Sequence, residues 1–183
     1  LGKLAELVDA GIDIHFFTGN HDIWTFGYLE KEVGLIIHRQ GEIIQLGNKT
    51  FFLAHGDGLN SDEKGFKIIR KLFHSQLAQK MFRYVPAQLG QEFGYNWSKH
   101  NRERILHIEN VYKGEQNEEL VVFAKKFAQI NPHVDFMIFG HRHLALDLQI
   151  LDKKRVVILG DFVSIFSYGK FDGENFTLEY FEM

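Results

Sequence analysis

The chain of 183 residues contains no cysteine and only 2 prolines. The lack of cysteine excludes thiol catalysis, zinc ribbons and a disulfide framework in this chain. No apolar run approaches the ~20 residues needed to cross a bilayer, and no basic and then apolar leader opens the sequence. We therefore expect a cytoplasmic protein in which histidine, asparagine or carboxylate side chains bind any metal.

The residues that are present predict one globular domain over 1–183, since 45% of them are hydrophobic and 25% are charged. The net charge of −3 is unevenly distributed: residues 64–104 contain nine Lys and Arg against two Glu, and the rest contains twelve against twenty-two acidic residues. Such a basic segment suits an anionic lipid surface, a phosphorylated substrate or nucleic acid, or it is a solvated helical face. The acidic remainder argues against nucleic acid as a partner.

Hydrophobic spacing predicts an α/β fold. Residues Lys3–Ala10 have a helical pattern and lead directly into an apolar strand at Ile12–Thr18. This order is the second half of a βα unit, so we expect that an N-terminal portion of the fold is missing before Leu1. Further strands are predicted at Leu35–His38, Glu42–Leu46, Thr50–His55, Val134–Phe139, Ala145–Leu151, Arg155–Leu159 and Phe176–Phe181. Helical spacing over residues 59–130 predicts an inserted helical cap.

Three polar clusters follow predicted strand ends, at Gly19–Asp22, His55–Asp57 and Gly140–His143. Histidine binds borderline divalent metals, and asparagine and carboxylate oxygens suit Mn, Fe or Mg. Glycines beside the ligands let the backbone turn sharply and approach a bound anion. Any one cluster alone would be read as a structural turn, but the three together predict a metal site.

In this order the clusters resemble the calcineurin-like binuclear metallophosphoesterases, whose signature is D-x-H, G-D-x-x-D, G-N-H-[D/E], a later H, and G-H-x-H. The last three blocks are present and the first two are absent. The resemblance implies a β-sandwich flanked by helices and a pair of divalent ions, manganese first, with Fe, Zn or Mg as alternatives. Without the first two blocks the chain cannot assemble the intact metal pair, so we expect it to be inactive by itself.

Position by position, the resemblance implies that Asn20, His55 and His141 bind the second metal and that His143 binds the first. It also implies that His21 contacts the phosphate or protonates the leaving group.

Two acidic residues near these ligands take other roles. The resemblance gives Asp22 the task of orienting His21. Asp161 follows a glycine like the missing G-D-x-x-D block, but it lies after Gly140–His143 and position 164 is serine. We expect Asp161 to form a turn or cap.

The predicted insert, residues 59–130, is both basic and apolar. His55-Gly56-Asp57-Gly58-Leu59 followed by a basic helix, and the stretch Trp97-Ser98-Lys99-x-Asn101-Arg102, resemble the pattern of the UDP-2,3-diacylglucosamine pyrophosphohydrolases of lipid A synthesis, a branch of that family. The resemblance implies a helical cap, a nucleotide-sugar lipid substrate and contact with an anionic membrane surface, peripherally on the inner membrane. The polar cap residues that the resemblance assigns to the substrate are Ser98, Lys99, Asn101 and Arg102. One departure is that known members have arginine where this chain has His21. Packing of the apolar positions within the protein is the alternative.

The resemblance implies hydrolysis of a phosphoanhydride, with UMP and 2,3-diacylglucosamine 1-phosphate as products. Two alternatives stay open at this point. One is a phosphodiesterase or phosphatase for a soluble nucleotide, and the other is a non-catalytic binding protein with a phosphoesterase fold.

Overall fold

The computed structural model describes residues 1–59, 75–105 and 111–182, without the side chains of residues 76, 97–105 and 152. The helices are α1 (Gly2–Asp9), α3 (Gln76–Phe82), α4 (Ala87–Ile105) and α5 (Glu119–Ile130), with short helical turns η1 (Leu29–Val33) and η2 (Leu151–Lys153). The strands are β1 (His15–Phe17), β2 (Ile36–His38), β3 (Glu42–Leu46), β4 (Lys49–Ala54), β5 (Phe136–Phe139), β6 (Ala145–Gln149), β7 (Arg155–Leu159), β8 (Ser167–Phe171) and β9 (Phe176–Tyr180).

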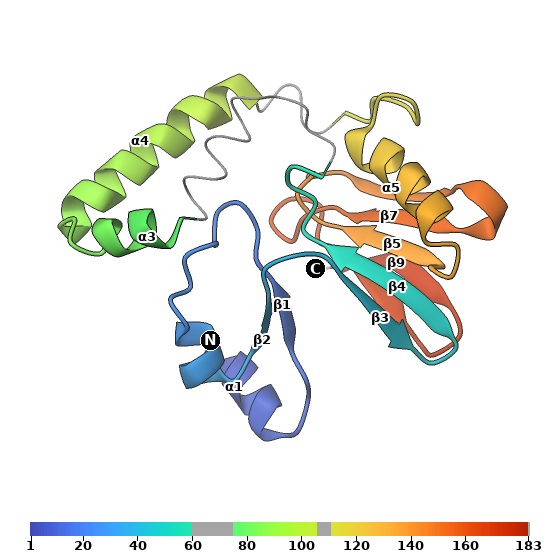
Figure 1. Ribbon diagram of the computed structural model, residues 1–183, viewed down its shortest axis with the longest axis horizontal. Coiled ribbons are helices and arrows are strands. Elements are labelled where there is room, and N and C mark those ends of the chain that lie inside the picture. The colour runs from blue at the N-terminus through green and yellow to red at the C-terminus, as the bar shows by residue number, and fades with distance from the viewer. Residues whose placement is uncertain (60–74, 106–110, 183) are drawn as a thin grey trace.

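A five-stranded sheet with the order β3-β4-β5-β7-β6 forms the body of the fold (Figure 1). The central strands β4, β5 and β7 are parallel, and β3 and β6 pair antiparallel to them at the two edges. All four residues of β5 are buried, as a parallel strand with both faces covered requires. The mixed α/β class is therefore confirmed, and the predicted strands at β3 and β7 have the predicted bounds.

Helix α5 covers one face of this sheet, and the β8–β9 hairpin covers the other. On the α5 face the buried cluster consists of Phe52, Ala54, Leu120, Val121, Ala124, Ala128, Val134, Met137, Phe139, Ile150, Val156 and Ile158. On the hairpin face it consists of Phe51, Phe136, Ile138, Val157 and Phe176. Sequence analysis did not predict β8, whose central three residues are all exposed. Because the hairpin contributes Phe176 to the core, it buries the second face of the sheet.

The N-terminal elements form a small separate unit, in which β1 and β2 make a parallel pair. His15 Nδ1 lies 2.8 Å from His38 Nε2, and the two rings stack. The strand β1 is shorter than the predicted Ile12–Thr18. Its last residues lead into Gly19–Asp22, so this unit delivers the first polar cluster toward the main sheet.

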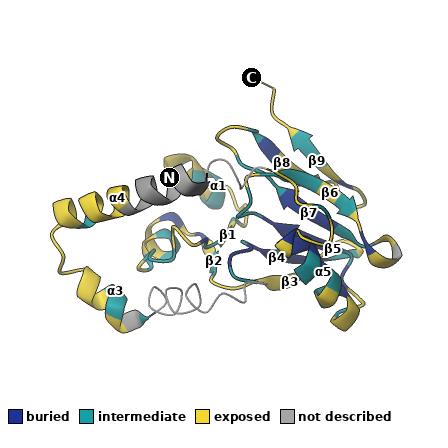
Figure 2. Ribbon diagram, turned by 90° about the horizontal axis from the view of Figure 1, so that it is seen from above, coloured by how far each residue is buried: buried dark blue, intermediate teal, exposed yellow. Residues whose placement is uncertain are grey.

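Helices α3 and α4 stand away from the sheet and are largely exposed where their side chains are described (Figures 1 and 2). Leu77 and Met81 of α3 are among the exposed apolar residues. By contrast, α5 lies within the predicted insert, 59–130, but packs on the sheet and belongs to the body of the fold. Among the described residues, no helix is both long and apolar enough to cross a membrane.

Candidate metal centre

The second and third polar clusters meet at the carboxyl ends of β4 and β5. These strands are parallel neighbours, and the last pair in their register is Ala54 with Phe139. The chain therefore leaves both strands at the same end of the sheet, the one formed by the carboxyl ends of the parallel strands. There the backbone N–H of Gly140 donates to the carbonyl of His55 over 3.0 Å, which joins the two loops directly.

The first cluster reaches the same place through Asn20. Its amide Oδ1 lies 3.2 Å from Nε2 of His55. This close approach depends on Gly19, because a Cβ built there would lie 2.6 Å from Cε1 of the His55 ring. The third cluster adds His141, whose ring centre is 5.2 Å from that of His55, with the ring planes inclined by 65°. The structure thus brings together Asn20, His55 and His141, the three residues assigned to one metal.

Burial holds both imidazoles in the neutral form that binds metal ions. Burial, with a smaller contribution from the neighbouring His55 ring and against the opposing charge of Asp57, lowers the pKa of His141 to about 4. Burial likewise lowers the pKa of His55, although the carboxylates of Asp57 and Asp22 oppose the shift. At neutral pH both rings therefore offer nitrogen lone pairs without first losing a proton.

His143 is exposed and is oriented from outside the cluster. Its Nδ1 lies 3.2 Å from Oδ2 of Asp161, a carboxylate whose side chain is only 8% exposed. Burial acts to raise the pKa of Asp161, but hydrogen bonds from the backbone and hydroxyl of Ser164 and from the backbone of Val163 and Ile165 hold it well below its usual range. The predicted turn role of Asp161 is confirmed by these bonds. Its contact with His143 was not predicted, because it spans 18 positions.

His21 is exposed and directly follows Asn20, whose amide contacts the His55 ring. Asp22 accepts a hydrogen bond from the backbone N–H of Gly19. The Asp22 carboxylate therefore closes the turn that carries Asn20 and His21.

Across the described residues, no three histidine or carboxylate side chains converge as a ready-made metal site. The donor set that does meet is two neutral imidazoles and one amide oxygen. Two atoms that bind one divalent ion in adjacent octahedral positions lie about 3 Å apart, which fits the 3.2 Å between Asn20 Oδ1 and His55 Nε2. The residues present therefore fit a partial site for a divalent ion such as Mn, Fe or Zn.

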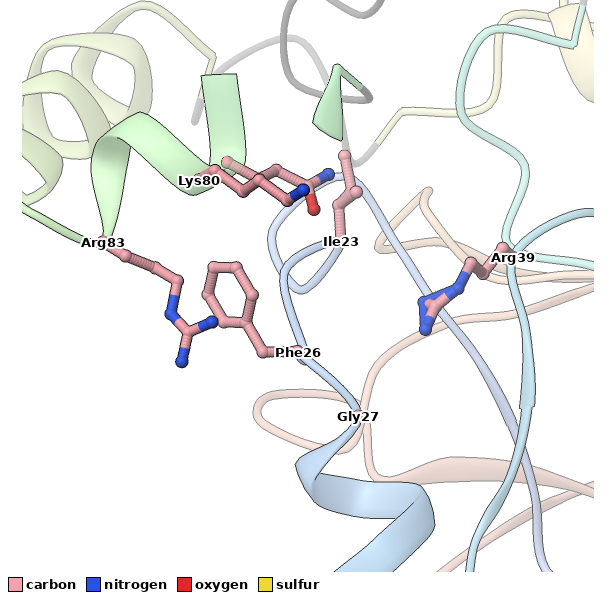
Figure 3. A pocket seen from close by; sticks show the side chains of 7 residues that line it. Ile23, Phe26, Gly27, Arg39, Lys80 and Arg83 are labelled. Atoms are coloured by element: carbon pink, nitrogen blue, oxygen red, sulfur yellow. The ribbon is translucent and has the colours of Figure 1, made fainter. Parts of the chain in front are cut away.

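The residues that follow Asp22 line a cavity of about 350 Å³ against α3. Figure 3 shows Phe26 and Arg83 side by side in this cavity, where the guanidinium carbon of Arg83 lies 5.3 Å from the centre of the Phe26 ring. The wall combines apolar groups with positive charge and includes Ile23, Phe26, Gly27, Arg39, Lys80 and Arg83. Sequence analysis missed this cavity, although the basic helix and the apolar residues after Asp22 were visible signals. The side chains of Ser98, Lys99, Asn101 and Arg102, on α4, lie outside the described residues.

Comparison with known proteins finds relatives along the whole chain. The chain is 40% identical to the UDP-2,3-diacylglucosamine hydrolase of Porphyromonas gingivalis over 193 aligned positions, which cover 100% of this chain and 74% of the relative. Proteins of the same name from Photorhabdus laumondii and Yersinia pestis are 28% and 26% identical, over 76% and 85% of this chain and 56% and 64% of their own lengths. No protein-family model matches the chain.

Proposed function

Since the chain belongs to the UDP-2,3-diacylglucosamine hydrolase family, we propose that it hydrolyses the pyrophosphate bond of UDP-2,3-diacylglucosamine in lipid A biosynthesis. The products would be UMP and 2,3-diacylglucosamine 1-phosphate. The observation that carries this proposal is that Asn20, His55 and His141 lie together at the carboxyl ends of β4 and β5. With it we propose that the sheet and the β8–β9 hairpin form the β-sandwich of the metallophosphoesterases.

Asn20, His55 and His141 would hold one divalent ion, and His143 would contribute to a second, with manganese as the first candidate. Bound ions would supply Lewis-acid charge to a phosphate group and a source of nucleophilic water at neutral pH. The chain itself would contribute the neutral imidazole rings of His55 and His141 as ligands for the ion. Asp161 contributes by fixing the ring of His143 through Nδ1, which leaves Nε2 for the ion.

His21 would contact the phosphate or donate a proton to the leaving group. It is exposed beside the two half-buried histidines, so a substrate phosphate can reach it. Asp22 supports this role by closing the turn on Gly19, and it would also orient His21. Replacement of the ring should therefore affect the reaction more than metal content.

Helices α3 and α4 would form the cap over this centre, with Ser98, Lys99, Asn101 and Arg102 contacting the sugar phosphate. The cavity between the loop after Asp22 and α3 supports an amphipathic anionic substrate, because its wall has both phenyl and guanidinium groups. Exposed Leu77 and Met81 beside Lys80 are suited to the surface of an anionic membrane. The protein would act in the cytoplasm, at the inner membrane.

The test measures UMP release by the natural gene product that contains this chain, with Mn²⁺, from detergent-dispersed UDP-2,3-diacylglucosamine. UDP-glucose and a small phosphodiester are run in parallel. Turnover of the acylated substrate alone supports the proposal. Turnover of the soluble substrates alone would favour a general phosphodiesterase, and turnover of none would favour a binding protein.

A further inference from the structure

Arg142 lies between the candidate ligands His141 and His143, on a backbone in an unusual conformation. His141 has a φ of 62°, in the left-handed region that a non-glycine residue rarely adopts. The next N–H, that of Arg142, reaches back to the carbonyl of Gly140 over 2.6 Å. Backbone of this kind persists only where surrounding contacts hold it, and the contacts of the adjacent Arg142 are among those that can do so.

The side chain of Arg142 is nearly buried and pairs with a buried carboxylate. Its Nε lies 3.1 Å from Oε1 of Glu118, and the two side chains are 12% and 2% exposed. Its Nη2 donates to Oε2 of Glu118 over 3.3 Å and to the carbonyl of Val111 over 3.2 Å. One guanidinium thus joins the ligand loop to the start of α5 and to the segment that precedes it.

The first turn of α5 also supports the loop that carries His55. A Cβ built on Gly56 would lie 3.2 Å from Cβ of His141 and 3.3 Å from the methyl groups of Leu120. Glu118, the residue before α5, and Leu120, in its first turn, therefore contact the two ligand loops from one platform. The Leu120 contact is apolar and non-directional, whereas the ion pair with Arg142 fixes an orientation.

We propose that Arg142 is a positioning residue, which holds His141 and His143 in place for the metal through its ion pair with Glu118 and its bond to Val111. This inference rests on the proposed function, since it assumes that these histidines bind the ion. In this role Arg142 does not contact the substrate. It affects the metal centre by fixing the backbone of the loop that carries His141 and His143.

The chain offers a matched control in Arg155. This residue also pairs with a carboxylate, that of Asp147, and donates to a backbone carbonyl, that of Phe176. It lies at the other end of the parallel strands, opposite Phe136 in the register, whereas the candidate ligands follow Phe139. Loss of either arginine removes an arginine–carboxylate pair, with the Arg155 pair the more exposed of the two, and only Arg142 is next to the candidate ligands.

The experiment titrates Co²⁺ into the full chain and follows its visible absorption, for wild type, Arg142→Met, Arg142→Lys and Arg155→Met, at a temperature where circular dichroism shows all four folded. We expect Arg142→Met to weaken Co²⁺ binding at least about tenfold, Arg142→Lys to recover part of it, and Arg155→Met to stay within about twofold of wild type. Glu118→Gln should weaken binding as Arg142→Met does, and the double variant should be no weaker than either. Equal Co²⁺ binding by wild type and Arg142→Met, or equal losses in both methionine variants, would overturn the proposal.

A second readout uses the metal-free protein, so that it does not depend on the proposed metal centre. In ¹H–¹⁵N spectra of the histidine rings, Arg142→Met should shift or broaden the signals of His141 and His143. The signals of His15 and His38, on β1 and β2, should not move. If wild type binds no Co²⁺, the proposed metal centre fails, and the ring signals still decide the inference: unmoved His141 and His143 signals would overturn it.

Discussion

Substitution of Gly19 by alanine tests the packing that brings the first loop to the metal centre. The added Cβ would lie 2.6 Å from Cε1, 2.8 Å from Nε2 and 2.9 Å from Nδ1 of the His55 ring. Carbon atoms in contact normally stay about 3.5 Å apart or more, so the ring must retreat by about 1 Å. The 3.2 Å contact between Asn20 and His55 would then be lost.

The cost can be worked out from this displacement. An added methyl group that forces a half-buried ring aside should reduce the free energy of unfolding by about 1–3 kcal/mol. In a chain of this length each kcal/mol lowers Tm by about 2–4 °C. Divalent-ion affinity should fall about 10- to 100-fold, because His55 and Asn20 would no longer face one point.

The assay combines thermal unfolding with Mn²⁺ titration, and elemental analysis of the wild-type chain should show at most one weakly held ion. Gly94→Ala is the control, because a Cβ on Gly94, inside α4, meets nothing within 4 Å. That variant should be more stable by about 0.5–1 kcal/mol and should bind Mn²⁺ as wild type does. If Gly19→Ala matched wild type in both stability and affinity, the His55 ring would not occupy the place described.

Side chains of the metal centre and of the proposed cap lead to three further expected outcomes. In the natural gene product, His21→Ala should lower turnover about 10²- to 10⁴-fold with metal content unchanged. UMP release and elemental analysis would measure the two quantities. If His21→Ala lost as much metal as His141→Ala, His21 would have to be assigned as a metal ligand. In metal-free protein, His141 has a pKa of 6.5 in the unfolded chain and of about 4 in the folded chain. Between these two pH values the unfolded chain binds the proton more strongly, so the free energy of unfolding should fall by about 3 kcal/mol as the pH drops from 6.5 to 4. Urea unfolding in EDTA would measure this fall, and His141→Gln should flatten it. Lys99→Ala or Arg102→Ala should raise KM for the diacylated substrate about 10- to 100-fold without changing hydrolysis of a small phosphodiester, and equal effects on both substrates would contradict the assignment.

The parts of the fold that were predictable are those whose pattern is local. β3 and β7 have the predicted bounds, and α1 differs from its prediction by one residue at each end. β8 was missed because Gly169 and Lys170 interrupt its apolar pattern. A signal was present in Asp172–Asn175, which separates two phenylalanines, and Asp172 does close that turn by accepting from the N–H groups of Glu174 and Asn175.

Three of the predicted site residues lie together in the structure, but the contacts around them were not predicted. His55 and His141 come together because β4 and β5 are parallel neighbours, although the predicted insert separates them along the chain. Asn20 joins them from the loop after β1, in a different sheet. No local sequence pattern predicts that β4 and β5 pair. The ion pair of Arg142 with Glu118 was likewise invisible, because an arginine between two histidines and a glutamate before a helix each look like surface residues.

In the proposed metal centre, the two histidines of the His-Arg-His run would be prepared for ligation by different means. Burial keeps His141 neutral, which costs stability in acid but leaves one ring nitrogen unprotonated at neutral pH. His143 is exposed and uses Asp161 instead, because that ionised carboxylate can only accept and therefore takes a hydrogen bond from Nδ1 of the ring. The two means act on separate rings, but both rings depend on one stretch of backbone. Arg142 is the residue between them, so its anchorage on Glu118 affects both.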